Sequence, residues 1–348
     1  MTYSSVSKSL IVLVCSVIVL SCGHPLAEIP PKVITEQTPH DTDDPAIWIN
    51  RENPEESIVF GTDKDEINGG VYAYNLDGKI IRDKSITGLS YPNNVDLAYG
   101  FKLPDSTQTD IIMFTEREKN QVRLFSVPDM QPLDGGGFPV FEDESSTDLR
   151  RPMGIGLFKD PNSGNIFPIV SRKAGPKDNY LYQYQLVSDS LGIDLKLVRK
   201  FGNYSGKKEI EAVAVDNELG HVYYSDEMHC IHKYYAHPDK GNKELACFGA
   251  EYFKRDVEGI AIANYQDGSG YLIVSDQQAH SFSVFDRESN AFISQINLGT
   301  IETDGCDVTT TSLGSKFPSG LFVSMTDSKE FYFHDFKDLV DMIGASKE

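Results

Sequence analysis

The fold is decided by the stretch Ile58-Val59-Phe60-Gly61-Thr62-Asp63-Lys64, an apolar run that ends in a polar triplet. Five further strands end in the same way, and each stands between two other apolar strands. The six units follow one another at steps of about 50 residues, a period typical of propeller blades. The triplets are Thr62-Asp63-Lys64, Thr115-Glu116-Arg117, Ser171-Arg172-Lys173, Ser225-Asp226-Glu227, Ser275-Asp276-Gln277 and Thr326-Asp327-Ser328.

The units predict an all-β fold, a six-bladed β-propeller with four-stranded antiparallel blades. Runs such as Val71-Tyr72-Ala73-Tyr74 favour strands, and Asn68-Gly69-Gly70 indicates a turn. We expect a short helix near residues 338–343, and five blades plus an extra sheet remain an alternative. The fourth strands are predicted at residues 79–83, 138–141, 195–201, 244–248 and 292–297, with the N-terminal strand 33–36 completing the sixth blade and closing the ring.

The charge balance restricts the partners. The 348 residues include 32 basic and 52 acidic ones, a net charge of −20. Such a surface disfavours nucleic acid, and it repels an anionic substrate unless metal ions or a local basic cluster reverse the field. One propeller over residues 33–348 accounts for the length, and we expect a monomer.

The N-terminus is typical of an exported bacterial lipoprotein. Lys8 precedes an apolar run over residues 10–20, and Ser21 stands directly before Cys22. This predicts a lipoprotein-type signal peptide over residues 1–21, lipidation of Cys22 and a short tether over residues 22–32. The protein would then contact the membrane only through its lipid anchor, at the periplasmic or outer surface. An ordinary secretory signal is the alternative.

Three cysteines remain once Cys15 is assigned to the signal and Cys22 to the lipid, namely Cys230, Cys247 and Cys306. An odd number argues against a disulfide framework, so we interpret them as buried small hydrophobic residues. A bond between Cys230 and Cys247 remains open. The cysteine spacing predicts no zinc site.

In such blades the starts of the first strands and the ends of the second strands lie around one mouth of the central channel. Crowded carboxylates there repel one another, and oxygen-rich clusters suit calcium better than zinc. The cations beside them predict an anion of high charge density, such as a phosphate. The starts carry Asp43, Asp44, Asp96, Glu209, Glu211, Asp256, Glu258, Asp304 and Asp307, and the ends carry Lys64, Arg117, Arg172, Lys173, Asp226, Glu227, Asp276 and Gln277.

Several segments, in order, resemble the β-propeller (alkaline) phytases over most of the chain after residue 38. The similar segments are Asp43-Asp44-Pro45-Ala46-Ile47-Trp48, Thr62-Asp63-Lys64, residues 71–78, Asn93-Asn94-Val95-Asp96, Ile210-Glu211-Ala212-Val213, Asp256-Val257-Glu258-Gly259, residues 270–273, residues 281–287 and residues 303–308.

The resemblance implies a six-bladed propeller that binds several Ca²⁺ ions and hydrolyses phytate, or lower inositol phosphates, by attack of a calcium-activated water. It implies that Lys64, Arg117 and Lys173 contact phosphate. The calcium ligands it implies are Asp43, Asp44, Glu211, Glu227, Asp256, Glu258, Gln277 and Asp304, with Asp226 competing for the place of Glu227 and Asp307 as a further candidate.

The chain departs from the family pattern at Asp65, where a second Lys is usual, and at Met153, where an aromatic hydroxyl is usual. Ala174 replaces an acid and Ala212 a Gly. These departures bear on the number and affinity of the calcium ions rather than on the fold. Two other functions remain as alternatives: a calcium-dependent lactonase-type propeller, and a surface lipoprotein that binds phosphorylated ligands without turnover.

Overall fold

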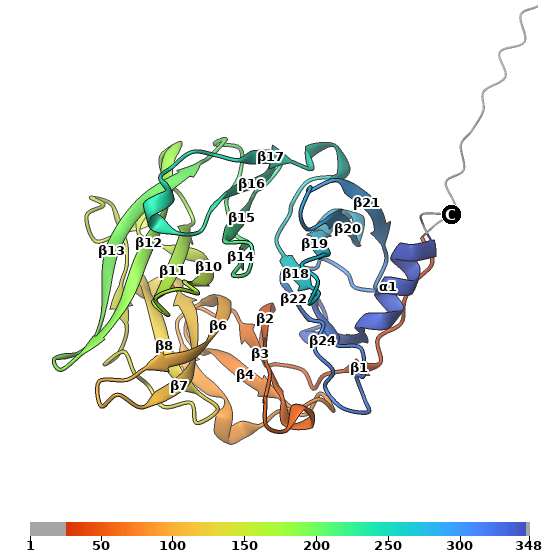
Figure 1. Ribbon diagram of the computed structural model, residues 1–348, viewed down its shortest axis with the longest axis horizontal. Helices are drawn as coiled ribbons and strands as arrows, with labels where there is room; N and C mark the ends of the chain where they lie inside the picture. Colours follow the sequence, from red (N-terminus) through yellow and green to blue (C-terminus); the bar gives the residue numbers. More distant parts are fainter. Residues whose placement is uncertain (1–25, 346–348) are drawn as a thin grey trace, which may run out of the picture.

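The chain forms a ring of six four-stranded antiparallel sheets (Figure 1), as predicted. The computed structural model describes residues 26–345. The first three blades contain β2 (Thr42–Trp48), β3 (Ile58–Asp63), β4 (Gly69–Tyr74) and β5 (Ile86–Leu89); β6 (Pro92–Lys102), β7 (Gln108–Glu116), β8 (Gln121–Val127) and β9 (Phe138–Pro139); and β10 (Pro152–Lys159), β11 (Ile166–Arg172), β12 (Asp178–Asp189) and β13 (Gly192–Asn203).

The fourth and fifth blades repeat this order, and the sixth takes its last strand from the other end of the chain. They contain β14 (Val213–Asp216), β15 (His221–Asp226), β16 (Cys230–Tyr235) and β17 (Ala246–Phe248); β18 (Ile260–Asn264), β19 (Gly270–Asp276), β20 (Ser281–Asp286) and β21 (Phe292–Ile296); and β22 (Cys306–Thr309), β23 (Leu321–Thr326), β24 (Glu330–Asp335) and β1 (Val33–Ile34).

The N-terminal strand closes the ring as expected. Val33 of β1 pairs with Phe333 of β24 in antiparallel register. Close packing of the first blade on the sixth requires a glycine in β3, because a Cβ on Gly61 would lie 2.2 Å from the ring of Phe331. The sixth blade is therefore completed by backbone pairing with β1 and held against the first blade by side-chain packing.

The outer strand of the first blade was predicted in the wrong place. Residues 79–83 do not form it: Ile80 makes a single bridge to Tyr74, and Arg82–Lys84 forms a 3₁₀ turn. The strand is β5 instead, which pairs with residues 69–71 of β4. After the Asp77-Gly78 turn the chain forms only one bridge to β4, between Ile80 and Tyr74. The charged residues Arg82–Lys84 then leave the strand as a 3₁₀ turn.

The apolar core is divided among the contacts between neighbouring blades. Between the first two blades, for example, Trp48 and Phe60 pack with Phe114 and Phe125. Five further buried clusters of the same kind occupy the other contacts in the described part of the chain. Because burying each large side chain contributes about 1.5–3 kcal/mol, these contacts hold the mouth residues of adjacent blades in a fixed relation.

Both ends of the described chain pack on the rim. Helix α1 (Phe336–Ala345), two residues longer at each end than expected, buries Phe336, Leu339 and Ile343 against the last two blades. Ile29 is buried and its N–H donates to the carbonyl of Asn297. Residues 28–32 therefore pack on the propeller instead of forming part of a tether.

The bond between Cys230 and Cys247 that the sequence left open is present, so the preferred interpretation of both as buried hydrophobic residues was wrong. Cys230 and Cys247 form a disulfide that joins β16 to β17, whereas Cys306 is free and buried. The signal peptide and Cys22 lie outside the described residues. Among residues 26–345, no helix is both long and apolar enough to cross a bilayer.

Candidate functional site

The three positions of each triplet point in different directions, and in the second, third and fifth triplets the first position faces the next blade. The hydroxyl of Thr115 donates to the carbonyl of Met153 at 2.8 Å, and that of Ser171 donates to the carbonyl of Ile210 at 2.7 Å. Ser275 reaches the carbonyl of Asp304 in the same way. These hydroxyls hold the start of one innermost strand against the end of its neighbour's second strand.

The second position turns into its own blade and holds the loop that leads into the first strand. Carboxylates there accept from loop N–H groups: Asp63 from Asp41, Glu116 from Ser90, Asp226 from Ser205 and Asp276 from Lys254. Arg172 does the equivalent by donating to the carbonyl of Leu149. The structure therefore does not bring Asp226, Asp276 or Arg172 to the mouth.

The third position faces the mouth, because side chains alternate along a strand. Lys64 contacts carboxylates of the first and sixth blades: its Nζ lies 3.3 Å from Asp43 Oδ1 and 2.5 Å from Asp304 Oδ2. Burial lowers the pKa of Lys64, but Asp43 and Asp304 outweigh it and leave the pKa well above its usual range. Lys64 therefore stays cationic within the acidic mouth.

The other two predicted cations reach the same mouth. Arg117 is buried, with its guanidinium 4.0 Å from the ring centre of Tyr91, and its charge acts on both Asp43 and Glu211. Lys173 is more exposed and pairs with Glu209. One mouth therefore holds an arc of three cations next to buried carboxylates.

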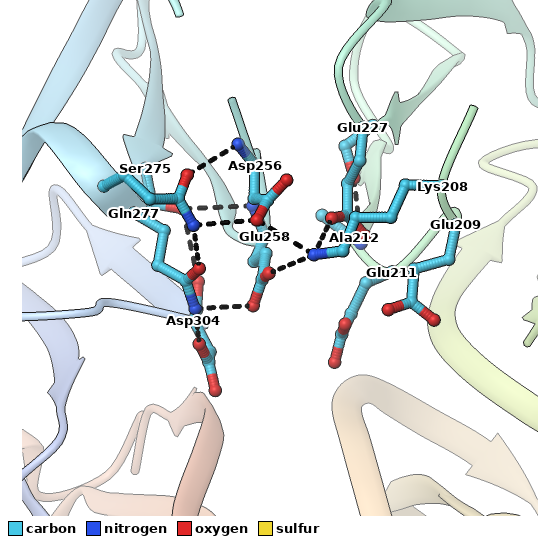
Figure 2. Close-up of polar contacts among 12 residues, drawn as sticks. Lys208, Glu209, Glu211, Ala212, Glu227, Asp256, Glu258, Ser275, Gln277 and Asp304 are labelled. Carbon is cyan, nitrogen blue, oxygen red and sulfur yellow. Dashed lines mark hydrogen bonds and ion pairs between the residues drawn. The ribbon is translucent and has the colours of Figure 1, made fainter. Parts of the chain in front are cut away.

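One acidic cluster combines residues of the fourth and fifth blades (Figure 2). Ligand oxygens of Glu227, Asp256 and Glu258 lie within 4.8 Å of one another, and those of Glu209, Glu211 and Glu227 form a second such group. The ammonium of Lys208 contacts all three members of the first group, at 2.6 Å from Glu227, 2.9 Å from Asp256 and 3.5 Å from Glu258. Apart from Lys208, neither oxygen of Glu227 has a hydrogen-bond donor.

A connected set of polar side chains crosses the mouth. The amide of Asn93 donates to Asp43 at 2.6 Å and to Glu211 at 2.8 Å. Gln277 donates to Glu258 at 3.1 Å and to Asp304 at 2.7 Å (Figure 2). These contacts place carboxylates from the first, fourth, fifth and sixth blades within one site.

Burial is the main electrostatic feature of these carboxyl groups. Desolvation raises the pKa of Glu227 to about 8, although Lys208 opposes the rise. It raises the pKa of Glu211 to about 8 and, together with the like charge of Glu211, that of Glu258 to about 11. The pKa of Asp43 rises to about 6 for the same reason. Carboxyls held out of water in this way favour a cation that would let them ionise.

The remaining predicted acids lie along the channel wall. Asp44 Oδ2 accepts from the N–H of Val95 in the second blade, and Asp307 Oδ2 accepts from the N–H of Ile47 in the first. Both line a cavity of about 140 Å³ with Asp96 and Glu258. Desolvation raises the pKa of Asp307 to about 7 and holds that of Asp44 well above its usual range.

The positions that depart from the family pattern bring no ligand oxygen from their side chains. Met153 is completely buried, and Ala174 ends in a methyl group. The carboxylate of Asp65 accepts from the N–H groups of Ile67 and Asn68, so it is turned into its own loop. Any ion near the second and third blades has correspondingly fewer oxygens.

Sequence reasoning missed Lys208 and Asn93 and assigned no ligand role to Glu209. Glu209 is itself one of the residues expected at the start of an innermost strand, and Asn93 stands next to another such start, so their position was a usable signal. For Lys208 there was none, because only the folded loop shows which way a lysine side chain lies.

Comparison with known proteins supports the resemblance to the phytases. A family model described as Phytase matches residues 6–331. The 3-phytase of Bacillus subtilis (strain 168) is 30% identical over 298 residues, which cover 81% of this chain and 73% of that protein.

Solved structures show more distant similarity. A Dos1 propeller matches with a TM-score of 0.45 and 11% identity, covering 82% of this chain and 66% of that chain. A functionally unknown protein from Desulfotomaculum acetoxidans DSM 771 matches with a TM-score of 0.48 and 16% identity, covering 75% and 73%. With the family model matching nearly the whole chain and a 3-phytase at 30% identity, the chain belongs to the phytase family.

Proposed function

We propose that this protein is a calcium-dependent phosphomonoesterase that releases phosphate from phytate. The observation that carries the proposal is the position of Lys64 and Arg117 at the same mouth as the buried carboxylates of Asp43 and Glu211. The family and the similarity to a 3-phytase support phytate as the substrate.

The cations bind and orient the substrate in this proposal. Arg117 can hold two oxygens of one phosphate, because its guanidinium presents parallel N–H groups, while Lys64 supplies a compact charge. Lys173, more exposed and on the next blade, can hold a neighbouring phosphate of the same ring. An inositol with several phosphates would therefore be bound by adjacent blades at once.

The buried carboxylates fit calcium. They offer many oxygens from several blades, no imidazole or thiol lies in the clusters around Glu227, and the two Glu227 oxygens lack donors other than Lys208. Glu211, Glu227, Asp256, Glu258, Asp43 and Asp304 would hold the ions, with the amide oxygen of Gln277 as a neutral ligand. Bound calcium would polarise the phosphoryl oxygen and lower the pKa of a water molecule beside it.

The chain's own groups then prepare the reaction. Lys64 would offset the charge of the phosphate, and the carboxylates would stay ionised if they held a cation. Asn93 fixes Asp43 and Glu211 in one orientation through its two N–H groups. The Lys208 ammonium, which lies among the same carboxylates, would have to leave the cluster for a calcium ion to bind there.

The test is a time course of phosphate release from phytate by the purified protein, with calcium or with chelator. We expect release only with calcium, and a loss of about ten- to hundredfold in kcat/KM for Lys64→Ala and Arg117→Ala, since each removes a charged hydrogen bond. Lys240→Ala, an exposed lysine beyond the far end of β16, is the matched control. Tight binding of phytate without release, or lactone hydrolysis instead, would contradict the proposal.

We also propose that the protein is an exported lipoprotein and a monomer, lipidated at Cys22 and specific for the 3-phosphate. Ser21-Cys22 after an apolar run supports the first part, and the similarity to a 3-phytase supports the last. Cys22→Ser should move the protein from the membrane to the soluble fraction. Membrane retention of this variant would argue against the anchor.

A further inference from the structure

A compact group of sulfur and nitrogen atoms lies at the outer part of the fourth blade. Cys230 begins β16, and His232 follows two residues later on the same face of the strand. His232 pairs across the sheet with Cys247 of β17, and Cys230 and Cys247 are bonded to each other. His229 belongs to the turn that precedes β16.

The nitrogen and sulfur atoms of the two histidines and two cysteines lie close to one another in pairs. Ligand atoms of His229, Cys230 and His232 are within 4.8 Å of one another, as are those of His232, Glu244 and Cys247. His229 Nε2 lies 4.0 Å from Cys247 Sγ. Every pair among the two histidines and two cysteines is therefore close, although the chain spacing gave no such signal.

His232 already has the environment of a metal-bound histidine. It is 3% exposed, and its Nε2 lies 3.3 Å from Asp226 Oδ2, an oxygen that also accepts from the N–H of Ser205. Histidines that ligate a metal through one nitrogen usually donate from the other to a carboxylate held in this way.

The other nitrogen of His232 is available for a ligand. Its Nδ1 is buried and has no hydrogen-bond partner. Glu244 Oε2 is 3.3 Å away, outside hydrogen-bond geometry, and accepts instead from the hydroxyl of Tyr234. A buried imidazole nitrogen without a hydrogen bond, on a histidine grouped with Cys247 and Glu244, is the arrangement that a metal ion would satisfy.

We propose that reduction of the Cys230–Cys247 disulfide creates a Cys₂His₂ site for Zn²⁺, formed with His229 and His232. A dithiol donates two electrons and two protons and becomes a disulfide itself, while the S–S bond breaks to give two thiols. Zn²⁺ then replaces the two thiol protons, which are released to water, and is held by two thiolates and two neutral imidazoles.

The geometry and the ligand types select this metal. In a tetrahedral site with Zn–S bonds of about 2.3 Å, the two sulfurs stand roughly 3.8 Å apart, so they need only separate after reduction. Thiolate and imidazole exclude calcium, which takes oxygen ligands. A cavity of about 120 Å³ is lined by Met228, His229 and Cys230, and so lies beside two of the four proposed ligands.

The test uses the full-length protein, reduced with a phosphine, freed of metal and kept in excess calcium so that oxygen sites do not take up the probe. Co²⁺ is added to the reduced and oxidised forms. We expect one equivalent to bind the reduced form only, with a thiolate-to-cobalt charge-transfer band that Zn²⁺ removes. Absence of the band, or equal binding by the oxidised form, would overturn the proposal.

Variants assign the ligands. Cys247→Ser should abolish the band, whereas Cys306→Ser, a change at the buried free cysteine, should leave it intact. Asp226→Asn should weaken metal binding about 10- to 100-fold, since it removes the negative charge behind His232 while its amide oxygen can still accept from Ser205. A band that survives Cys247→Ser would place the thiolates elsewhere and refute the site. Circular dichroism against the reduced wild type checks that each variant is folded.

Discussion

Removing calcium and raising the pH from about 5 to about 7 should destabilise the protein through the buried carboxyls of the mouth. A carboxyl whose pKa is raised by folding keeps its proton in the folded state after the unfolded chain has lost it. Stability therefore falls as the pH rises from the unfolded pKa towards the folded one. For Glu227 this window runs from 4.5 to about 8.

The magnitude follows from the retained proton. One carboxyl costs about 1.4 kcal/mol of unfolding free energy for each pH unit, hence roughly 3 kcal/mol between about pH 5 and about pH 7. For a domain of this size, that is on the order of 5 °C in Tm. Glu211 and Glu258 are raised by the same cause and act in the same direction. With calcium bound, the carboxylates are paired with a cation and the loss should disappear.

The assay is differential scanning calorimetry of the metal-free and calcium-saturated protein across this pH range. Glu227→Gln should reduce the slope of Tm against pH in the metal-free form, because it removes the titrating proton. Glu52→Gln removes an equal charge from the exposed surface and is the matched control. A metal-free Tm that stays constant or rises with pH, or a slope that Glu227→Gln leaves unchanged, would refute the reasoning.

Three further changes test particular contacts. Arg287→Met leaves Asp216, which accepts two hydrogen bonds of 2.7 Å from Arg287, buried without its partner, and should cost about 3–5 kcal/mol in urea unfolding; a loss below about 1 kcal/mol would contradict a buried pair. Gly305→Ala would place a Cβ 2.3 Å from Asp44 Oδ1, so we expect a loss of about 1–3 kcal/mol together with weaker calcium binding by calorimetric titration, and unchanged calcium affinity would separate Asp44 from the metal. Lys208→Met removes a competing cation from the acidic cluster and should tighten calcium binding roughly tenfold, or about 1.4 kcal/mol, in the same titration; weaker binding would show that the ammonium does not compete.

The ring and its closure could be predicted because they follow from repetition. Each unit repeats the same apolar strands, and closing the ring requires a strand that the last unit lacks. The outer strand of the first blade was misplaced because residues 79–83 and 86–89 are both short and β-compatible. Only the pairing register with β4 distinguishes them.

The location of the site could be predicted from the sequence, whereas the identity of some of its residues could not. Strand alternation decides between Asp226 and Glu227, but the register needed to apply it comes from the structure. Lys208 is a flexible side chain on a loop, and its position depends on the carboxylates of another blade. The pairing of Cys230 and Cys247 depends on the register of β16 and β17, which an odd cysteine count does not reveal.

The contact between the first and sixth blades reaches the mouth. Lys64 and Asp43 belong to the blade on one side of it, and Asp304 lies at the entry to the blade on the other. Val33 of β1 can pair with Phe333 of β24 only after the last blade has been synthesised. A ribosome-bound chain that lacks this blade therefore has neither a closed ring nor a complete site. Enzymatic competence would then appear only at the end of synthesis, and C-terminal truncation would abolish it even though nearly every mouth residue is still present.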